Sequence, residues 1–179
     1  MSANQMRRLS SLLLVSALIA CANSSSSHDV RRDSYEIYGA VLDSFAPATS
    51  GPIAVGSRTW PYALSRALGD TSALYRGVRS DTGVGAALLD AYDRANQRDT
   101  LLCECFSASS RVQLVDHQLR PDVPGPIMLS AIGFDSRRSR ALVAASRVCG
   151  PLCGSSAVYL VVRQPTGWRV QRRLLVGAS

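Results

Sequence analysis

The clearest hydrophobic pattern in the chain runs from Ile127 to Val176, where short apolar segments alternate with turns. The predicted strands occupy 127–134, 140–148, 158–162 and 168–174. Polar residues at 135–139 and the tripeptide Pro165-Thr166-Gly167 have the composition of turns. The two middle strands are apolar on both faces, so we expect helices to cover the second face of the sheet. In the last strand, strict alternation points Arg169, Gln171 and Arg173 outward.

Upstream of this meander, the apolar spacing becomes helical at two places. Asp33 and Glu36 form a capping-box pattern before an apolar stripe, which predicts a helix at 34–45. Asp81-Thr82 is placed to cap a second helix, at 81–97. On that helix, Asp90 and Arg94 form an i,i+4 pair.

The remaining segments give weaker signals. Strands are predicted at 53–60 and 111–119, and Pro61 favours a sheet edge for the first. Residues 62–68 fit one or two helical turns, 70–85 read as a loop, 101–106 fit either a strand or a helix end, and 121–126 form a rigid connector. The fold class is therefore α+β: an antiparallel β-meander of about four to six strands with two main helices packed on it. One folded domain is expected at 33–179.

The N-terminus resembles a bacterial lipoprotein signal. Arg7 and Arg8 precede an apolar run from Leu9 to Ala20, which is too short to span a membrane. The run ends in Leu18-Ile19-Ala20-Cys21, which resembles a lipobox and implies cleavage before Cys21 and lipidation of its sulfur. Residues 1–20 would then be the signal peptide and 21–32, with four consecutive serines, a flexible tether. An ordinary secretory signal is the alternative, and either Met1 or Met6 serves as the start.

The resemblance also implies a location. The residue after Cys21 is Ala22 rather than Asp. In sorted lipoproteins this favours the outer membrane, so we expect a lipid-anchored protein of the cell envelope that faces the periplasm.

The charge of the chain limits its partners. All 20 basic residues are arginine, for which the codon usage of a GC-rich genome is the favoured explanation and selection for phosphate or carboxylate recognition the alternative. Without Arg7 and Arg8 the chain carries 18 arginines against 13 acids, a modest bias toward anionic surfaces and not the footprint of a nucleic-acid-binding protein. The clusters Arg137/Arg138/Arg140 and Arg169/Arg172/Arg173 fit contact with an anionic lipid or glycan, or simply solvated turn and strand faces.

Four cysteines remain after Cys21, namely Cys103, Cys105, Cys149 and Cys153. An even number outside the cytoplasm predicts disulfides, and three pairings are possible. A local Cys149–Cys153 bridge is favoured because both residues lie at the feet of one tight bend. Two long-range bridges that join Cys103 and Cys105 to that bend are the alternative. A redox site or a thiolate metal site is less well supported, because both flanks of the bend are strands and no histidine accompanies the four residues.

Other catalytic patterns are incomplete. His117 is the one histidine of the expected domain, and its neighbour Asp116 points the other way on a strand. Glu36 and Glu104 are the only glutamates, and Gly83-Val84-Gly85 lacks the rest of a dinucleotide loop. We therefore expect no cofactor, no metal and no assigned catalytic residue.

Part of the chain resembles a family of uncharacterised bacterial secreted proteins and lipoproteins. The resemblance rests on Gly133-Phe134, Ala141-Leu142-Val143, Cys149-Gly150-x-Leu152-Cys153-Gly154 and Gly167-Trp168-x-Val170, with a start like Tyr35-x-x-Tyr38-x-x-x-Leu42. It implies export and this fold but no activity, and Cys103-x-Cys105 is not part of the pattern. The function expected is a non-catalytic binding or structural module of the envelope. A periplasmic enzyme or a thiol- or metal-handling protein that uses the four cysteines is the alternative.

Overall fold

The computed structural model describes residues 30–46, 52–69, 71–102, 106, 112–116, 125–150 and 153–178. The chain divides into two compact units, Met1–Tyr35 and Glu36–Ser179. In the first unit the described residues are helical, and the Ser34 hydroxyl donates to the Val30 carbonyl at 2.8 Å. The N-terminal helix covers 30–45, so Asp33 lies within it, and the predicted start at residue 34 is wrong.

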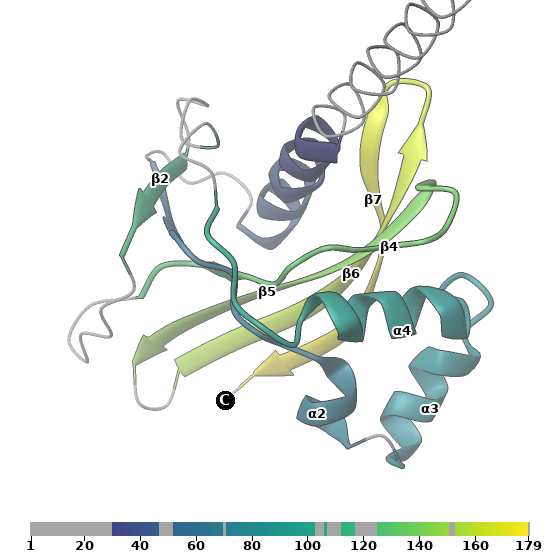
Figure 1. Ribbon diagram of the computed structural model, residues 1–179. Coiled ribbons are helices and arrows are strands. Elements are labelled where there is room, and N and C mark those ends of the chain that lie inside the picture. The colour runs from purple at the N-terminus through teal and green to yellow at the C-terminus, as the bar shows by residue number, and fades with distance from the viewer. Residues whose placement is uncertain are drawn as a thin grey trace, which may run out of the picture. The chain divides into compact units, whose positions relative to one another are not determined.

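The centre of the second unit is an antiparallel sheet of three long strands and two short ones (Figure 1). The long strands are β5 (Arg140–Gly150), β6 (Cys153–Gln164) and β7 (Gly167–Ala178), joined as consecutive hairpins. The short strands β3 (Met128–Leu129) and β4 (Gly133–Phe134) both pair with the outer edge of β5. The α+β class with an antiparallel meander is thus confirmed.

A buried polar cluster, formed by Ser130 and Asn96, interrupts the strand predicted at 127–134. Ser130 accepts the Ala144 amide on its hydroxyl at 2.8 Å, while its own amide donates to the Ala144 carbonyl at 2.9 Å. The Asn96 side chain accepts the Ala131 amide at 2.8 Å and donates to the carbonyls of Ala131 and Tyr92, each at 2.9 Å. The side-chain bonds of Ser130 and Asn96 interrupt the ladder and divide the segment into β3 and β4.

A separate, parallel pair of strands lies beside this sheet. β1 (Ile53–Gly56) pairs in parallel with β2 (Val112–Val115). On its other side β1 is bonded to Ile127, whose carbonyl accepts the Gly56 amide at 3.0 Å and whose amide donates to Ala54 at 2.9 Å. β1 is therefore flanked on both sides, and the edge position suggested by Pro61 is wrong. Both strands are also shorter than predicted.

Three helices lie on one face of the sheet: α2 (Leu64–Leu68), α3 (Ala73–Ser80) and α4 (Gly85–Ala95) (Figure 1). The predicted loop at 70–85 is wrong because it contains α3. Ser72 caps that helix by accepting the Tyr75 amide at 3.0 Å, and Tyr75 and Val78 supply its buried stripe. Asp90 pairs with Arg79 of α3 at 2.7 Å, and not with Arg94 as expected.

Both faces of β5 and β6 are buried, as their composition predicted. Side chains of α2, α3 and α4 form one core with the first face. The sheet residues of that core are Leu142, Ala144, Val158 and Leu160. The opposite face, with Val143 and Tyr159, is buried on the side of the N-terminal helix from Glu36 onward, and the Tyr38 hydroxyl donates to the Ser130 carbonyl at 3.1 Å (Figure 1). Among the described helices, none is long and apolar enough to cross a membrane.

Candidate functional site

The charges of the chain are separated along the sequence, and the fold gathers them in space. All 13 acidic residues lie at or before Asp135, whereas the stretch 136–179 contains eight arginines and no acid. Those arginines are Arg137, Arg138, Arg140, Arg147, Arg163, Arg169, Arg172 and Arg173. Since this stretch forms β5, β6 and β7, the long strands of the sheet carry positive charge alone.

Five of these arginines lie at one end of the sheet, where β5 and β7 begin and β6 ends, and Arg172 follows in the middle of β7 (Figure 1). We call this the basic end and define it by Arg137, Arg138, Arg140, Arg163, Arg169 and Arg172. Register fixes their order: Arg140 lies opposite Val162, which lies opposite Arg169. Paired residues in an antiparallel sheet share a face, so Arg140 and Arg169 flank Val162 on the α4 side.

Two irregularities in β7 decide which face each arginine occupies. Register shifts fall between Val158 and Tyr159 and between Leu160 and Val161 of β6. As a result Arg172 pairs with Leu160 and shares the face of Arg169, while Arg173 pairs with Tyr159 on the opposite face. Strict alternation predicted Arg169, Gln171 and Arg173 on one side, and this is wrong because each bulge reverses the alternation.

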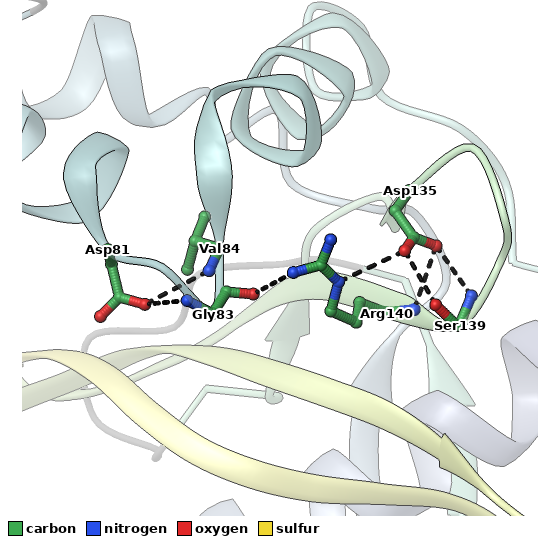
Figure 2. Close-up of polar contacts among 6 residues, drawn as sticks. All are labelled: Asp81, Gly83, Val84, Asp135, Ser139 and Arg140. Carbon is green, nitrogen blue, oxygen red and sulfur yellow. Dashed lines mark hydrogen bonds and ion pairs between the residues drawn. The ribbon is translucent and has the colours of Figure 1, made fainter.

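Arg140 is held between two loops, as Figure 2 shows. Its Nη1 donates to the Gly83 carbonyl at 2.9 Å, and its Nε lies 3.3 Å from the Asp135 carboxylate. The same carboxylate accepts the Ser139 amide at 2.7 Å, the Ser139 hydroxyl at 2.9 Å and the Arg140 amide at 3.1 Å. Asp135 therefore closes the β4–β5 turn and fixes the guanidinium of Arg140 at the same time.

Asp81 fixes the guanidinium of Arg172 on the other side of the α3–α4 loop. Its Oδ1 accepts the amides of Gly83 at 2.8 Å and Val84 at 3.2 Å (Figure 2), together with Arg172 Nη2 at 2.5 Å. A side chain at Gly83 would prevent this approach, because a Cβ there would lie 2.7 Å from Arg172 Nη2. The α3–α4 loop is thereby tied to β5 and β7 through two arginines.

The hydrogen bonds lower the pKa of both carboxyl groups. Burial raises the pKa of Asp81, but the bonds from Arg172, Gly83 and Val84 outweigh it, and the pKa lies below its usual value. Burial likewise raises the pKa of Asp135, and the donors of Arg140 and Ser139 outweigh it. Both groups are therefore ionised acceptors near neutral pH, which suits them for holding arginines and not for donating protons.

The other arginines lie over aromatic rings on the face of the N-terminal helix. The guanidinium of Arg138 lies 4.6 Å from the centre of the Phe134 ring, and that of Arg163 lies 5.7 Å from the Trp168 ring. The two rings meet edge to face at 5.9 Å. Such contacts hold the flat guanidinium groups at defined places. Nε and Nη2 of Arg138 are buried there, whereas Arg163 is exposed.

Arg137 and Arg169 differ from this set because both are exposed and lie at the tips of the basic end. Arg137 is in the β4–β5 turn, and Arg169 is the third residue of β7. Arg140 and Arg172 remain 40% and 47% exposed in their side chains, so they too present nitrogen atoms to solvent. Arginine forks match phosphate and carboxylate groups, and anion binding is the chemistry that this arrangement offers.

One cavity of about 760 Å³ lies elsewhere, beside β2. It is lined by Ser57, Leu101, Leu102, Val112, Gln113, Leu114 and Asp116. The Ser57 hydroxyl donates to Asp116 at 2.9 Å, so this lining carboxylate is already bonded. None of the described lining residues is an arginine or belongs to the basic end.

Several residues singled out from the sequence lie outside the described part of the chain, namely Cys21, Cys103, Glu104, Cys105 and His117. For Cys149 and Cys153 the structure gives the backbone only: β5 and β6 form a hairpin in which Gly150 pairs with Cys153. The Cys149–Cys153 bridge stays a prediction. Within the described residues, no group of three or more His, Cys, Asp or Glu is placed to hold a metal ion.

No protein-family model, curated protein or solved structure matches the chain in the comparisons made. The two arginine clusters are evident in the sequence, but their closeness in the folded sheet is not. The sequence does contain one indication of that closeness, because no acidic residue follows Asp135. Interpreting that signal requires knowing that 136–179 forms adjacent strands of one sheet.

Proposed function

We propose that the protein is a lipid-anchored component of the cell envelope whose domain is a non-catalytic binding or structural module. The observation that carries the proposal is the sequence Leu18-Ile19-Ala20-Cys21 at the end of a charged and apolar leader. Lipidation of Cys21 would attach the domain to the outer membrane, facing the periplasm. Several acyl chains on one residue would exceed what stable anchoring requires.

The arrangement of charges supports binding and not catalysis. The carboxylates of Asp81, Asp93 and Asp135 accept hydrogen bonds from main-chain amides at turns and helix starts. Their oxygen atoms therefore stabilise the local backbone. Arg137 and Arg169 are exposed at the basic end and are available for an anionic envelope component, such as a lipid or glycan. The family resemblance is consistent with export but adds no activity.

Labelling with a radioactive or clickable fatty acid tests the anchor in the producing bacterium. We expect wild type and the control Ser25→Ala to incorporate label and to sediment with membranes. Cys21→Ser should lose the label and remain as a precursor, because the peptidase acts only on the lipidated form. Equal label in Cys21→Ser and wild type would refute the anchor.

Counting thiols separates the binding module from the thiol- or metal-handling alternative. The purified mature domain, kept unreduced, should show no free thiol among Cys103, Cys105, Cys149 and Cys153 and no bound zinc or copper. Two reactive thiols with a lowered pKa, or one metal ion per chain, would overturn the proposal in favour of the alternative.

A further inference from the structure

We propose that the basic end binds the phosphate groups of anionic lipid headgroups in the membrane that carries the anchor. This inference rests on the proposed function, because it takes the domain to be tethered at a membrane surface. It adds a second contact between the protein and that membrane, made by the folded domain itself.

Positive charge predominates at this surface. Six arginines define the basic end, where Asp135 pairs with Arg140, Asp81 pairs with Arg172, and Glu36 Oε2 would lie 3.3 Å from a Cβ built on Gly167 at the start of β7. Arg137 and Arg169 have no acidic partner among the described residues, and both are exposed. The arginines of this end therefore outnumber the acids beside them, which attracts an anionic surface, and the attraction is weakened by salt.

The spacing suits several headgroups at once. Arg140 and Arg169 lie two strands apart on one face, which places their Cα atoms about 10 Å from each other. Asp135 and Gly83 fix Arg140, and Asp81 fixes Arg172, so two of the guanidinium groups are ordered before any ligand arrives. Ordered forks lose less conformational entropy when they bind phosphate.

The shape of β7 argues against the main competing partner, an acidic strand added to the sheet edge. β7 is the last strand in the order of the described sheet, but its two bulges break the regular ladder that an added strand would need. Arginines along such an edge also discourage strand pairing.

The tether keeps the two partners together. Eight residues lie between Cys21 and Val30, so nine residue-to-residue steps connect them, and nine steps span at most about 32 Å. A domain held this close to a membrane meets its lipids at high effective concentration. Weak individual contacts at the basic end are then sufficient to orient it.

The test uses the chain from residue 22, made without lipid, which retains the whole compact unit Glu36–Ser179. Its partition onto vesicles is measured by flotation, with phosphatidylglycerol mixed into phosphatidylcholine or with phosphatidylcholine alone. We compare wild type with the double variant Arg137→Gln/Arg169→Gln. The matched control, Arg66→Gln/Arg94→Gln, removes the same charge from exposed positions on α2 and α4.

We expect wild type to bind only the anionic vesicles, and less as salt is raised. Each basic residue at a membrane surface contributes about fivefold, so Arg137→Gln/Arg169→Gln should bind about 25-fold more weakly. The control variant should bind within about threefold of wild type. The effect of salt is measured on the wild type alone, so that part of the test does not depend on a variant that folds. For Arg137→Gln/Arg169→Gln, an unchanged melting temperature shows that the double variant is folded.

Two results would overturn the inference. One is equal loss in both double variants, which would mean that net charge matters and the basic end does not. The other is absence of vesicle binding together with binding to a soluble anionic polysaccharide such as heparin, which would assign the site to glycans. Neither result bears on labelling of Cys21, so failure of this inference and failure of the anchor are distinguishable.

Discussion

Gly133 is the point where β4 and α4 approach most closely. A Cβ built on Gly133 would lie 2.3 Å from Tyr92 Cα, 2.5 Å from Tyr92 N and 2.6 Å from Tyr92 Cβ. All three atoms belong to the helix backbone or its first side-chain atom, so no rotamer change can relieve the overlap. Gly133→Ala therefore requires α4 to move away from the sheet.

The magnitude follows from what that movement disturbs. α4 contributes Leu88, Leu89 and Tyr92 to the core, all nearly or fully buried. Overpacking of a filled core costs about 1–3 kcal/mol, and contacts with a displaced backbone belong at the upper end. We expect Gly133→Ala to lower the free energy of unfolding by about 3 kcal/mol, equivalent to roughly 6–12 °C in melting temperature for a domain of this size.

The assay is urea unfolding followed by far-ultraviolet circular dichroism. Gly77→Ala is the matched control, because Gly77 lies inside α3 and a Cβ there would meet nothing within 4 Å. We expect that control to be more stable than wild type by about 0.5–1 kcal/mol, since alanine is the better helix former. If Gly133→Ala has the same unfolding midpoint as wild type, the close packing of α4 on β4 is refuted.

Three further changes test the polar groups that hold this architecture. Asn96→Ala removes three hydrogen bonds at a fully buried site and leaves the backbone groups of Ala131 without these partners. Urea unfolding should therefore show that the free energy of unfolding falls by about 2–4 kcal/mol, and an unchanged free energy would refute the role of the polar cluster. Asp93→Ala removes the acceptor of the Leu64 amide and the Tyr75 hydroxyl, with an expected cost of about 1–2 kcal/mol in the same assay. Asp135→Asn tests the pH dependence of stability. Because the pKa of Asp135 is lowered in the folded protein, its contribution to the free energy of unfolding is present above about pH 4 and disappears as the pH falls through the pKa of the folded state. Wild type should therefore exceed this variant in stability at pH 7 and approach it at pH 2, and parallel curves would contradict the role assigned to Asp135.

The sequence predicted the elements whose pattern depends only on local periodicity. The long strands of the meander were identified because Leu142, Val143 and their neighbours are apolar without interruption. α4 was identified because its stripe repeats at helical spacing. These patterns reflect burial, which the chain must encode wherever a core forms.

The errors have a common physical origin in long-range hydrogen bonds. The break between β3 and β4 depends on Asn96, which is 35 residues from Ala131. The interior position of β1 depends on bonds to Ile127 and β2, and no local signal distinguishes a paired edge from a free one. α3 was missed because Gly77 suggested a loop, although the Ser72 cap and the buried Tyr75 and Val78 are sufficient for a short helix.

The position of the arginines follows from where the core ends. Across the α4 face, the row Leu142–Leu160–Arg172 passes from two buried residues to an exposed one. Across the opposite face, the row Val143–Tyr159–Arg173 does the same, and the guanidinium of Arg173 lies 6.0 Å from the Tyr159 ring. In these two rows, therefore, both faces change from apolar to cationic between β6 and β7. Since bulges at this boundary turn neighbouring arginines to opposite faces, β7 presents positive charge on both sides of the sheet. The arginines that follow the last acid in the sequence are in this way gathered along β7 and the adjoining strand ends.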